Sequence, residues 1–422
     1  MEEKNTRGRF EKPQINVCID RLKELTDNKK KCAVIKLYLE NFKAYNDSFG
    51  YDFGGMLINE VTSFLDSIDG IESYHIRGVE YILITKAHSQ RDVDEVLNTI
   101  LQRFDNTWNV KNLVCTCSVN AGVVHLPGYA NTPDDIFEQL SHAINESVML
   151  GQNEFAEYNE KLRKKIERRS IIAQQIPKAI KDGTLMVRFW PIYQVSRKRF
   201  TRIDCSIRMH CEGIGVISEE ELIPVAEQSG QIYAISQYAI TKVCELVSEL
   251  IAKNKDFETV AVKISPIQFL QERFAGDVAD IIKKTEVPAN RLAFEVSENT
   301  VHNMFSRAHS CMGELSGMGI EMILAGFGTG SLGVNSILSM SIDVVKIIRM
   351  LVWQIDNSSN GSALVDGLIY LCKNFGLKLV AEGVESEAQL KMLEESGCEY
   401  LKGLYYSGSL SAEELLPLLS EL

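Results

Sequence analysis

Apolar and polar positions in the first third of the chain alternate between the patterns of strands and helices. The runs 32–39 (CAVIKLYL) and 113–124 (LVCTCSVNAGVV) are nearly continuous and apolar, as in buried strands. Segment 74–85 (YHIRGVEYILIT) divides at Gly78 into two strand arms, which predicts a hairpin. Helical spacing of apolar residues follows at 60–68, 93–104 and 134–150. These interleaved elements predict a compact α/β domain.

A charged stretch follows this domain at 157–169 (EYNEKLRKKIERR), with six basic and three acidic side chains. Glu157 precedes Lys161, and Glu160 precedes Lys164, at the four-residue spacing that supports an exposed helix. We therefore expect a solvated helical linker here, and a basic docking surface is the alternative.

The remaining residues carry eight short apolar runs, most of them separated by helical stretches. Runs of this length and composition are typical of strands. Eight strands that largely alternate with helices predict a closed (β/α)8 barrel, whose functional side chains lie at the C-terminal strand ends. The predicted strands are 186–195, 202–211, 259–265, 292–298, 321–327, 343–348, 378–384 and 400–407.

Charged residues stand in or just after these runs, all round the predicted barrel. A single charge at a strand end is usually structural, but a charge on most strands of one barrel indicates a site. The charged residues are Asp204, Arg208, Lys263, Glu295, Glu298, Lys346, Glu382 and Lys402.

Composition narrows the class of protein. The 422 residues are 45% hydrophobic and 24% charged, which fits two or three globular domains. With 45 basic against 57 acidic residues, the net charge is −12. Such a chain does not bind nucleic acid through its overall field, so any anion site must be a local pocket. No uninterrupted apolar segment is long enough to span a membrane, so we expect a cytoplasmic protein with no membrane insertion.

The ten cysteines are scattered, which is typical of reduced thiols rather than of a disulfide framework. Cys115 and Cys117 alternate within one apolar run. We expect two core cysteines there, with a metal pair as the alternative.

Several phrases in the second half resemble the EAL family, whose members are cyclic di-GMP phosphodiesterases on a TIM-like barrel. These phrases are ELIPVAEQSGQI (221–232), FEVSENT (294–300), GFGTGSLG (326–333), VVKI (344–347), LVAEGVESEAQL (379–390) and LKGLYYS (401–407). In the first half, LENFKAYNDSFGYDFGG (39–55), HIRGVEYILI (75–84) and CSVNAGVV (117–124) resemble the GGDEF domain, the diguanylate cyclase fold.

The resemblance implies a GGDEF-like α/β palm domain followed by an EAL-type (β/α)8 TIM-like barrel. The expected divisions are an N-terminal extension at 1–30, a degenerate GGDEF-like domain at 31–158, a helical linker at 159–178 and a degenerate EAL-like barrel at 179–422.

The first domain lacks groups that the cyclase family uses to hold metal and nucleotide. Its hairpin reads RGVE at 77–80, so an arginine replaces the first glycine and a valine the first acidic residue. Tyr38 stands at the position of the family's metal aspartate, and Val148 at that of its phosphate-binding lysine. Gly55 replaces the guanine-contacting aspartate, which leaves Asn46 alone to read the base. We therefore expect no cyclase activity.

The barrel departs from the metal site that the resemblance implies, in which carboxylates and an asparagine hold magnesium or manganese. The signature Glu-Ala-Leu reads Asp204-Cys205-Ser206. Lys263 takes the place of the asparagine, and the paired metal-bridging aspartates are Ala325 and Gly326. Metal lowers the pKa of water from about 15.7 to about 7, worth on the order of 12 kcal/mol. Because an ammonium group cannot replace that effect, we expect no catalysis and no metal or other cofactor.

Four positions still match the family's catalytic site: Asp204, Glu295, Lys346 and Glu382. A weak or altered phosphodiesterase that uses these residues with Mg²⁺ or Mn²⁺ is the alternative function.

The lysines at the barrel mouth support a second hypothesis. Lys263 and Lys402 join Lys346 and Arg208 there, and fixed cations of this kind can bind phosphate without metal. The alternative is that Lys263 pairs with the nearby carboxylates and fills the vacated metal space. Trp190 either stacks on a base or belongs to the barrel core. The candidate ligand-binding residues are Trp190, Arg208, Lys263, Glu295, Lys346, Glu382 and Lys402.

The sequence as a whole predicts a catalytically degenerate GGDEF–EAL regulator of cyclic di-GMP signalling. It acts as a receptor for cyclic di-GMP or a related nucleotide, or as an adaptor for a protein partner. A scaffold without a nucleotide site is a third hypothesis, and no nucleic acid partner is expected. The resemblance is also consistent with a homodimer formed through 331–339.

Overall fold

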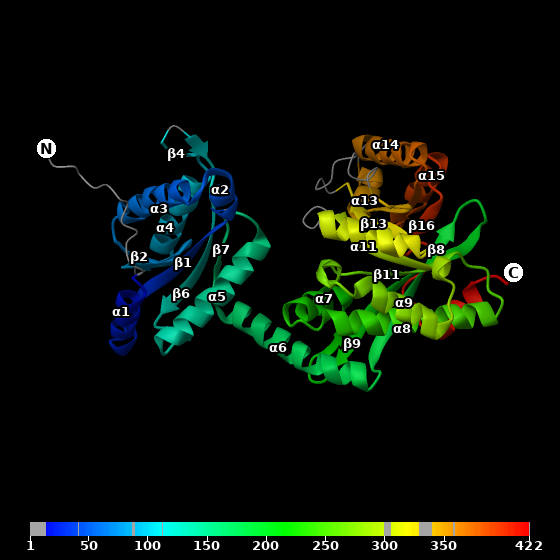
Figure 1. Ribbon diagram of the computed structural model, residues 1–422, viewed down its shortest axis with the longest axis horizontal. Coiled ribbons are helices and arrows are strands. Elements are labelled where there is room, and N and C mark those ends of the chain that lie inside the picture. Colours follow the sequence, from blue (N-terminus) through cyan, green and yellow to red (C-terminus); the bar gives the residue numbers. More distant parts are fainter. Residues whose placement is uncertain are drawn as a thin grey trace. The chain divides into compact units, whose positions relative to one another are not determined.

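The computed structural model describes residues 14–40, 42–86, 89–111, 113–298, 305–328, 340–357 and 359–421. The chain divides into two compact units, Met1–Glu167 and Arg168–Leu422 (Figure 1). The division falls within helix α6 (Glu160–Lys181), which covers most of the predicted linker. Pro177 lies inside this helix without ending it.

Within the described part of the first unit, five strands form one sheet in the order β2-β3-β1-β6-β7. Neighbouring strands are antiparallel except for β6 and β7. The predicted hairpin is confirmed: β2 and β3 meet at Gly78, whose φ of +55° favours glycine. The strands are β1 (Cys32–Glu40), β2 (Ile71–Arg77), β3 (Glu80–Thr85), β6 (Ser118–Leu126) and β7 (Phe155–Glu157).

Helices cover both faces of this sheet (Figure 1). Successive residues of a strand point to opposite faces, so β1 buries Ile35 and Leu37 against α3 and α4, and Val34 against α1 and α5. Helix α1 lies inside the predicted extension and packs through Cys18 and Leu22. The helices are α1 (Ile15–Asp27), α2 (Phe42–Phe49), α3 (Tyr51–Asp66), α4 (Gln90–Phe104) and α5 (Pro133–Leu150).

The run 113–124 is not the single strand that its apolar pattern predicts. Strand β5 (Leu113–Cys115) pairs with β4 (Trp108–Val110) in a separate two-stranded sheet, before β6 begins. Between β5 and β6, the carbonyl of Thr116 accepts a hydrogen bond from the Tyr45 hydroxyl rather than from a strand neighbour. Cys115 and Cys117 are buried free thiols, as expected of core cysteines.

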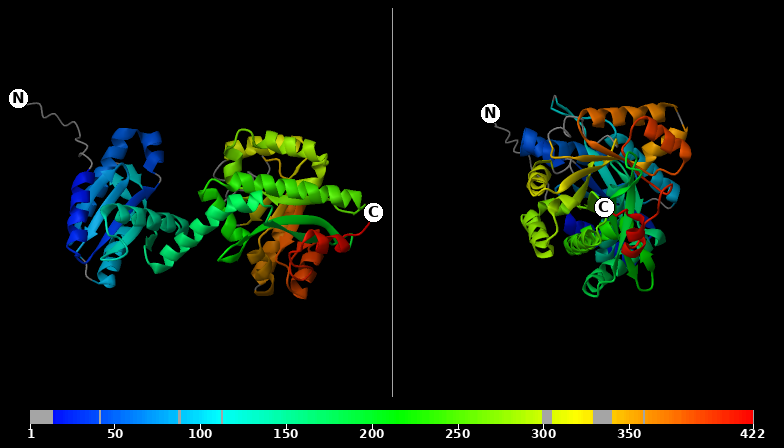
Figure 2. Two further views of the ribbon diagram at one scale, coloured as in Figure 1. Left: turned by 90° about the horizontal axis from the view of Figure 1, so that it is seen from below. Right: turned by 90° about the vertical axis from the view of Figure 1, so that its right-hand side faces the viewer.

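The described part of the second unit contains an eight-stranded closed barrel, as predicted (Figure 2). Strand β8 (Leu185–Gln194) closes the barrel and runs antiparallel to both neighbours, β9 and β16. The connection from β8 to β9 is therefore a hairpin instead of a βα unit, because the turn between them is too short for a helix. The other barrel strands are β9 (Arg199–Cys211), β11 (Thr259–Lys263), β12 (Leu292–Ser297), β13 (Glu321–Phe327), β14 (Val344–Ile347), β15 (Lys378–Glu382) and β16 (Tyr400–Lys402).

Strand β16 is shorter than the predicted 400–407. After Lys402 the chain turns, and the backbone N–H of Tyr405 donates to the carbonyl of Val384 in the loop that follows β15. The short strand β10 (Gly215–Ile217) pairs with the outer end of β9.

Helices surround the barrel strands and bury the largest hydrophobic core of the protein (Figure 2). Inside the barrel, a smaller apolar layer includes Ile192, Ile323 and Val380. No helix among the described residues has the length and apolar character needed to cross a membrane. The helices are α7 (Glu219–Gln228), α8 (Ile232–Ala252), η1 (Pro266–Leu270), α9 (Phe274–Thr285), η2 (Ala289–Arg291), α11 (Phe305–Gly317), α13 (Arg349–Asn357), α14 (Ser359–Asn374), α15 (Glu387–Glu395), α16 (Ala412–Leu415) and η3 (Leu416–Leu418).

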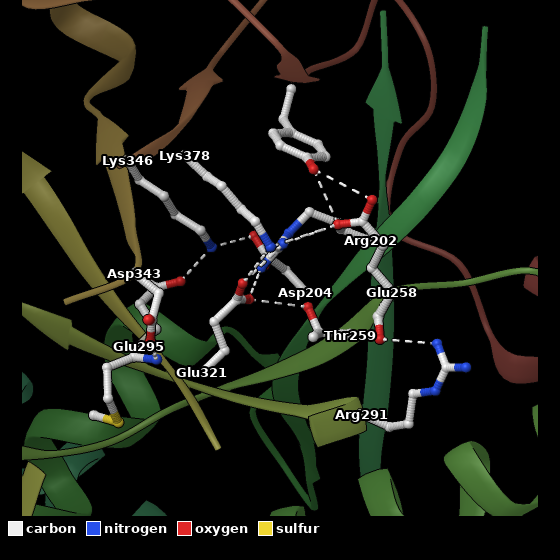
Figure 3. Close-up of polar contacts among 12 residues, drawn as sticks. Arg202, Asp204, Glu258, Thr259, Arg291, Glu295, Glu321, Asp343, Lys346 and Lys378 are labelled. Atoms are coloured by element: carbon white, nitrogen blue, oxygen red, sulfur yellow. Dashed lines mark hydrogen bonds and ion pairs between the residues drawn. The ribbon is translucent and has the colours of Figure 1, made fainter. Parts of the chain in front are cut away.

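A buried polar cluster lies at the N-terminal ends of the barrel strands (Figure 3). Arg202, at 2% exposure, bonds Glu258 at 3.2 Å and also pairs with Glu321. Lys378 bonds Glu321 at 2.8 Å, and the Tyr400 hydroxyl donates to Glu258 at 3.0 Å. The cluster joins the starts of several strands at the end of the barrel opposite the candidate site.

Candidate functional site

A buried chain of ion pairs forms the floor of the barrel mouth. Lys346 of β14 is fully buried, and its ammonium group donates to Asp204 at 2.7 Å and to Glu295 (Figure 3). Lys402 of β16 donates to the same Asp204 oxygen, Oδ2, at 2.6 Å and to Glu382 at 3.0 Å. Two ammonium groups therefore link three carboxylates from three other strands.

The proximity of opposite charges holds Lys346, Lys402 and Asp204 in their charged forms. Burial alone lowers the pKa of a lysine and raises that of an aspartate. Around Lys346, the carboxylates of Asp204 and Glu295 outweigh burial and hold its pKa above the usual range. Lys402 has a raised pKa for the same reason, and the two ammonium groups hold the pKa of Asp204 below its usual range. The floor thus holds two ammonium groups against three carboxylates, and the pKa shifts keep Lys346, Lys402 and Asp204 charged.

The carboxylate oxygens of this floor are bonded to lysines instead of lying open. Strand β13 places Ala325 and Gly326 where the family resemblance puts bridging aspartates, and Ala325 lies opposite Lys346 in the β13–β14 register. Magnesium and manganese need several oxygen ligands each. Within the described ranges, no three His, Cys, Asp or Glu side chains are grouped so as to hold a metal ion.

A cavity of about 370 Å³ opens above the floor, within the size range of small-molecule pockets. It brings together the predicted ligand-binding residues except Lys346, which lies beneath it. Those that line it are Trp190, Arg208, Lys263, Glu295, Glu382 and Lys402.

Two cations on one side of this cavity are not part of the floor. Lys263 ends β11, is exposed, and forms no ion pair with any residue that the structure describes. Arg208 lies farther along β9, half-buried, and its guanidinium donates only weakly to Ser409 at 3.4 Å.

Trp190 is half-buried opposite Asp204 in the β8–β9 pairing, with the Lys402 ammonium 5.8 Å from its ring centre. Its ring therefore lines the cavity rather than the barrel core.

The alternative prediction, that Lys263 pairs with the nearby carboxylates and fills the vacated metal space, is wrong about which lysine does so. Internal neutralisation occurs, but Lys402 performs it together with Lys346. Lys402 lies opposite Glu382 in the β15–β16 register, which aims its side chain at the floor.

Three further carboxylates line the cavity, and the analysis of charges at strand ends did not predict them. They are Glu219, Glu220 and Glu385. The Oε1 of Glu219 accepts a hydrogen bond from the Ile207 N–H at 3.2 Å. Burial raises the pKa of Glu219 to about 7, against the opposing effect of Lys263. For Glu219 and Glu220, the available signal was the run of three glutamates at 219–221, just after β10.

Around the hairpin of the first unit, the described residues present no open pair of carboxylates. Tyr38 lies opposite Glu80 in the β1–β3 register, and Glu80 pairs with Lys36 at 3.3 Å. Arg77 is exposed beside the turn, and Val148 is 45% exposed on α5. The predicted dimer segment, 331–339, lies outside the described residues.

Comparison with protein families matches two models in tandem. The model described as "EAL domain" matches residues 173–409, more than half of the chain. The model described as "Diguanylate cyclase, GGDEF domain" matches residues 17–154.

Curated relatives are similar over most of this chain. The "Bifunctional diguanylate cyclase/cyclic di-GMP phosphodiesterase MucR" of Pseudomonas aeruginosa is 22% identical over 389 residues, which is 92% of this chain and 57% of MucR. The "Biofilm architecture maintenance protein MbaA" of Vibrio cholerae is 24% identical over 398 residues, 91% of this chain and 50% of MbaA. The chain spans about half the length of the curated relatives it matches.

Solved structures share the fold. The S helix–GGDEF–EAL portion of Vibrio cholerae LapD, bound to cyclic di-GMP, matches with a TM-score of 0.65 and 16% identity over 93% of each chain. The MucR phosphodiesterase in its cyclic di-GMP complex matches with a TM-score of 0.55 and 24% identity, over 58% of this chain and 99% of that one.

Proposed function

This chain belongs to the EAL domain family, with a GGDEF domain ahead of its barrel, and from that premise we propose that it is a catalytically degenerate regulator of cyclic di-GMP signalling. In this proposal, the barrel mouth binds cyclic di-GMP or a related nucleotide without a divalent metal. The protein acts as a receptor and neither makes nor hydrolyses the nucleotide.

The ion pairs in the floor of the barrel mouth support the proposed loss of catalysis. The ammonium groups of Lys346 and Lys402 both contact Asp204 Oδ2, so this oxygen is already shared by two cations. Glu295 and Glu382 are each bonded to one of the same lysines. A metal ion would have to displace groups whose removal from these carboxylates leaves buried charges unpaired.

The rim of the cavity supports ligand binding. Lys263 and Arg208 lie outside the ion-paired floor and present N–H donors to the cavity. Lysine binds phosphate as a point charge, and arginine can bind it through two parallel hydrogen bonds. Trp190 offers an aromatic surface for a base. Relatives whose structures contain cyclic di-GMP make this nucleotide the first ligand to test.

Calorimetric titration with cyclic di-GMP, with and without EDTA, tests the proposal. We expect the same affinity in both conditions. Lys263→Asn should weaken binding about tenfold, corresponding to the loss of one charge-assisted contact to phosphate. Lys284→Asn, which removes another exposed lysine, on α9 and outside the cavity, is the matched control and should leave the affinity unchanged.

The rival functions give different results in the same experiments. Hydrolysis of cyclic di-GMP with Mg²⁺ or Mn²⁺, abolished by Glu295→Ala, would establish the weak phosphodiesterase instead. No heat at high nucleotide concentration, with or without metal, would refute the receptor and leave a protein-binding adaptor or scaffold.

A further inference from the structure

The cavity has a further cation outside the floor, Arg349, on the side opposite Lys263 and Arg208. Around the barrel the strands follow the order β8-β9-β11-β12-β13-β14-β15-β16, and β16 returns to β8. Arg208 lies on β9, and Arg349 follows β14 as the first residue of α13. Four strand steps separate β9 from β14 in either direction, so the two arginines line the same cavity from opposite walls.

Arg349 is held in a defined position at this wall. Its guanidinium stacks 3.9 Å from the ring centre of Trp353, one turn along α13, and donates to Glu385 at 2.7 Å. Its stem crosses Gly383, where φ is +84° and a side chain would collide with the Arg349 Cβ and Cγ. A guanidinium has five N–H donors, and the contact with Glu385 leaves others for a ligand.

We propose that the barrel mouth is a two-point anion clamp that selects a ligand with two separated phosphate groups. Arg208 with Lys263 forms one point and Arg349 forms the other, on either side of the ion-paired floor. The inference rests on the proposed function and extends it, because it assigns the second phosphate of a cyclic dinucleotide to Arg349.

Each cationic point binds a single phosphate weakly. The two points together therefore favour a ligand with two phosphates over a ligand with one. Arg349 is already paired with Glu385, and Glu219 and Glu220 lie near Lys263. A single phosphate therefore gains little, because it must compete with carboxylates for each cation. A ligand that reaches both points makes its second contact within the same complex, so the two contributions combine.

Titration of the full chain with cyclic di-GMP and with GMP tests the clamp. Arg349→Met keeps the apolar stem over Gly383 and Trp353 and removes the charge. Arg349→Met and Arg208→Met should each lower the affinity for cyclic di-GMP about tenfold. GMP, which has one phosphate, should lose affinity in no more than one of the two variants. Glu385→Gln frees the Arg349 guanidinium and should tighten the binding of cyclic di-GMP, which a merely structural role for Arg349 does not predict.

Arg197→Met is the matched control, since Arg197 also has one ion pair and comparable exposure, in the β8–β9 turn outside the cavity. Unchanged cyclic di-GMP affinity in Arg349→Met would overturn the clamp while leaving the receptor proposal intact. Equal losses of GMP affinity in both arginine variants would also overturn it. No binding of either nucleotide to the unmodified chain would refute the proposed function and the clamp together.

Discussion

Asp204 shows how one residue decides the chemistry of the mouth. A carboxylate at this position matches the family's metal site, yet in this chain its Oδ2 is occupied by two ammonium groups. The identity of the residue is thus a poor guide to its role, because that role depends on which cations the other strands bring to it.

The raised pKa of Glu219 makes the stability of the barrel depend on pH, which can be tested. Its pKa in the folded chain is about 7, against 4.5 for an ordinary glutamate. The folded state therefore binds this proton more tightly than the unfolded state, so the stability associated with neutral Glu219 is lost as the pH rises from about 4.5 to about 7. The cost of ionising Glu219 above this window is on the order of 3 kcal/mol.

We expect Glu219→Gln, which keeps an acceptor for the Ile207 N–H, to raise the free energy of unfolding of the barrel at pH 8. The gain should nearly vanish at about pH 3.5, where Glu219 is protonated in the folded state and mostly protonated in the unfolded state as well. Urea denaturation at the two pH values measures this difference. Glu220→Gln, the exposed neighbour, should change little, and a gain for Glu219→Gln that is independent of pH would contradict the account.

At the scale of the elements, the polar cluster around Arg202 links the N-terminal ends of the barrel strands and stabilises them. Strands β9, β13, β15 and β16 contribute side chains to this cluster, and Glu258 precedes β11. Its ion pairs join strands that are not all neighbours in the sheet, so the cluster couples their positions independently of the backbone ladder.

Arg202→Met should destabilise the barrel by about 3 kcal/mol, because it leaves Glu258 and Glu321 partly buried without their shared cation. Lys378 still pairs with Glu321, which keeps the loss at the lower end of the range for broken buried pairs. Chemical denaturation measures the change, with the exposed Arg197→Met as a control expected to cost less than about 1 kcal/mol. If Arg202→Met lowers the free energy of unfolding no more than the control does, the cluster does not stabilise the barrel.

At the scale of the whole molecule, each unit has hydrophobic cores of its own. In the first unit, the cores lie on the two faces of the five-stranded sheet. In the second, they lie inside the barrel and between the barrel and its helices. Since none of these clusters includes residues from both units, each unit contains the apolar contacts that its own folding requires.

Differential scanning calorimetry of the full chain should therefore resolve two transitions. Leu57→Ala removes a fully buried side chain of α3 and should lower the transition of the first unit, at a cost of about 2–5 kcal/mol. Arg202→Met should lower the other transition. A single transition that both variants shift equally would disprove independent unfolding.

The local pattern of the sequence determined most of the elements and the fold class. The eight barrel strands and the hairpin at Gly78 follow from short apolar runs between turn residues, and these signals are contained within a few neighbouring positions. The run 113–124 misled the prediction because apolar spacing does not show where a strand changes its pairing partner.

Only the tertiary structure decided how the charges of the mouth are used. Lys263 and Lys402 are both lysines at strand ends, yet one is exposed and the other lies in the floor. Likewise, Glu219 and Glu385 belong to segments that become cavity walls only when the barrel closes. Ion pairing depends on strand register and on closure between residues far apart in the chain, and no local spacing encodes either.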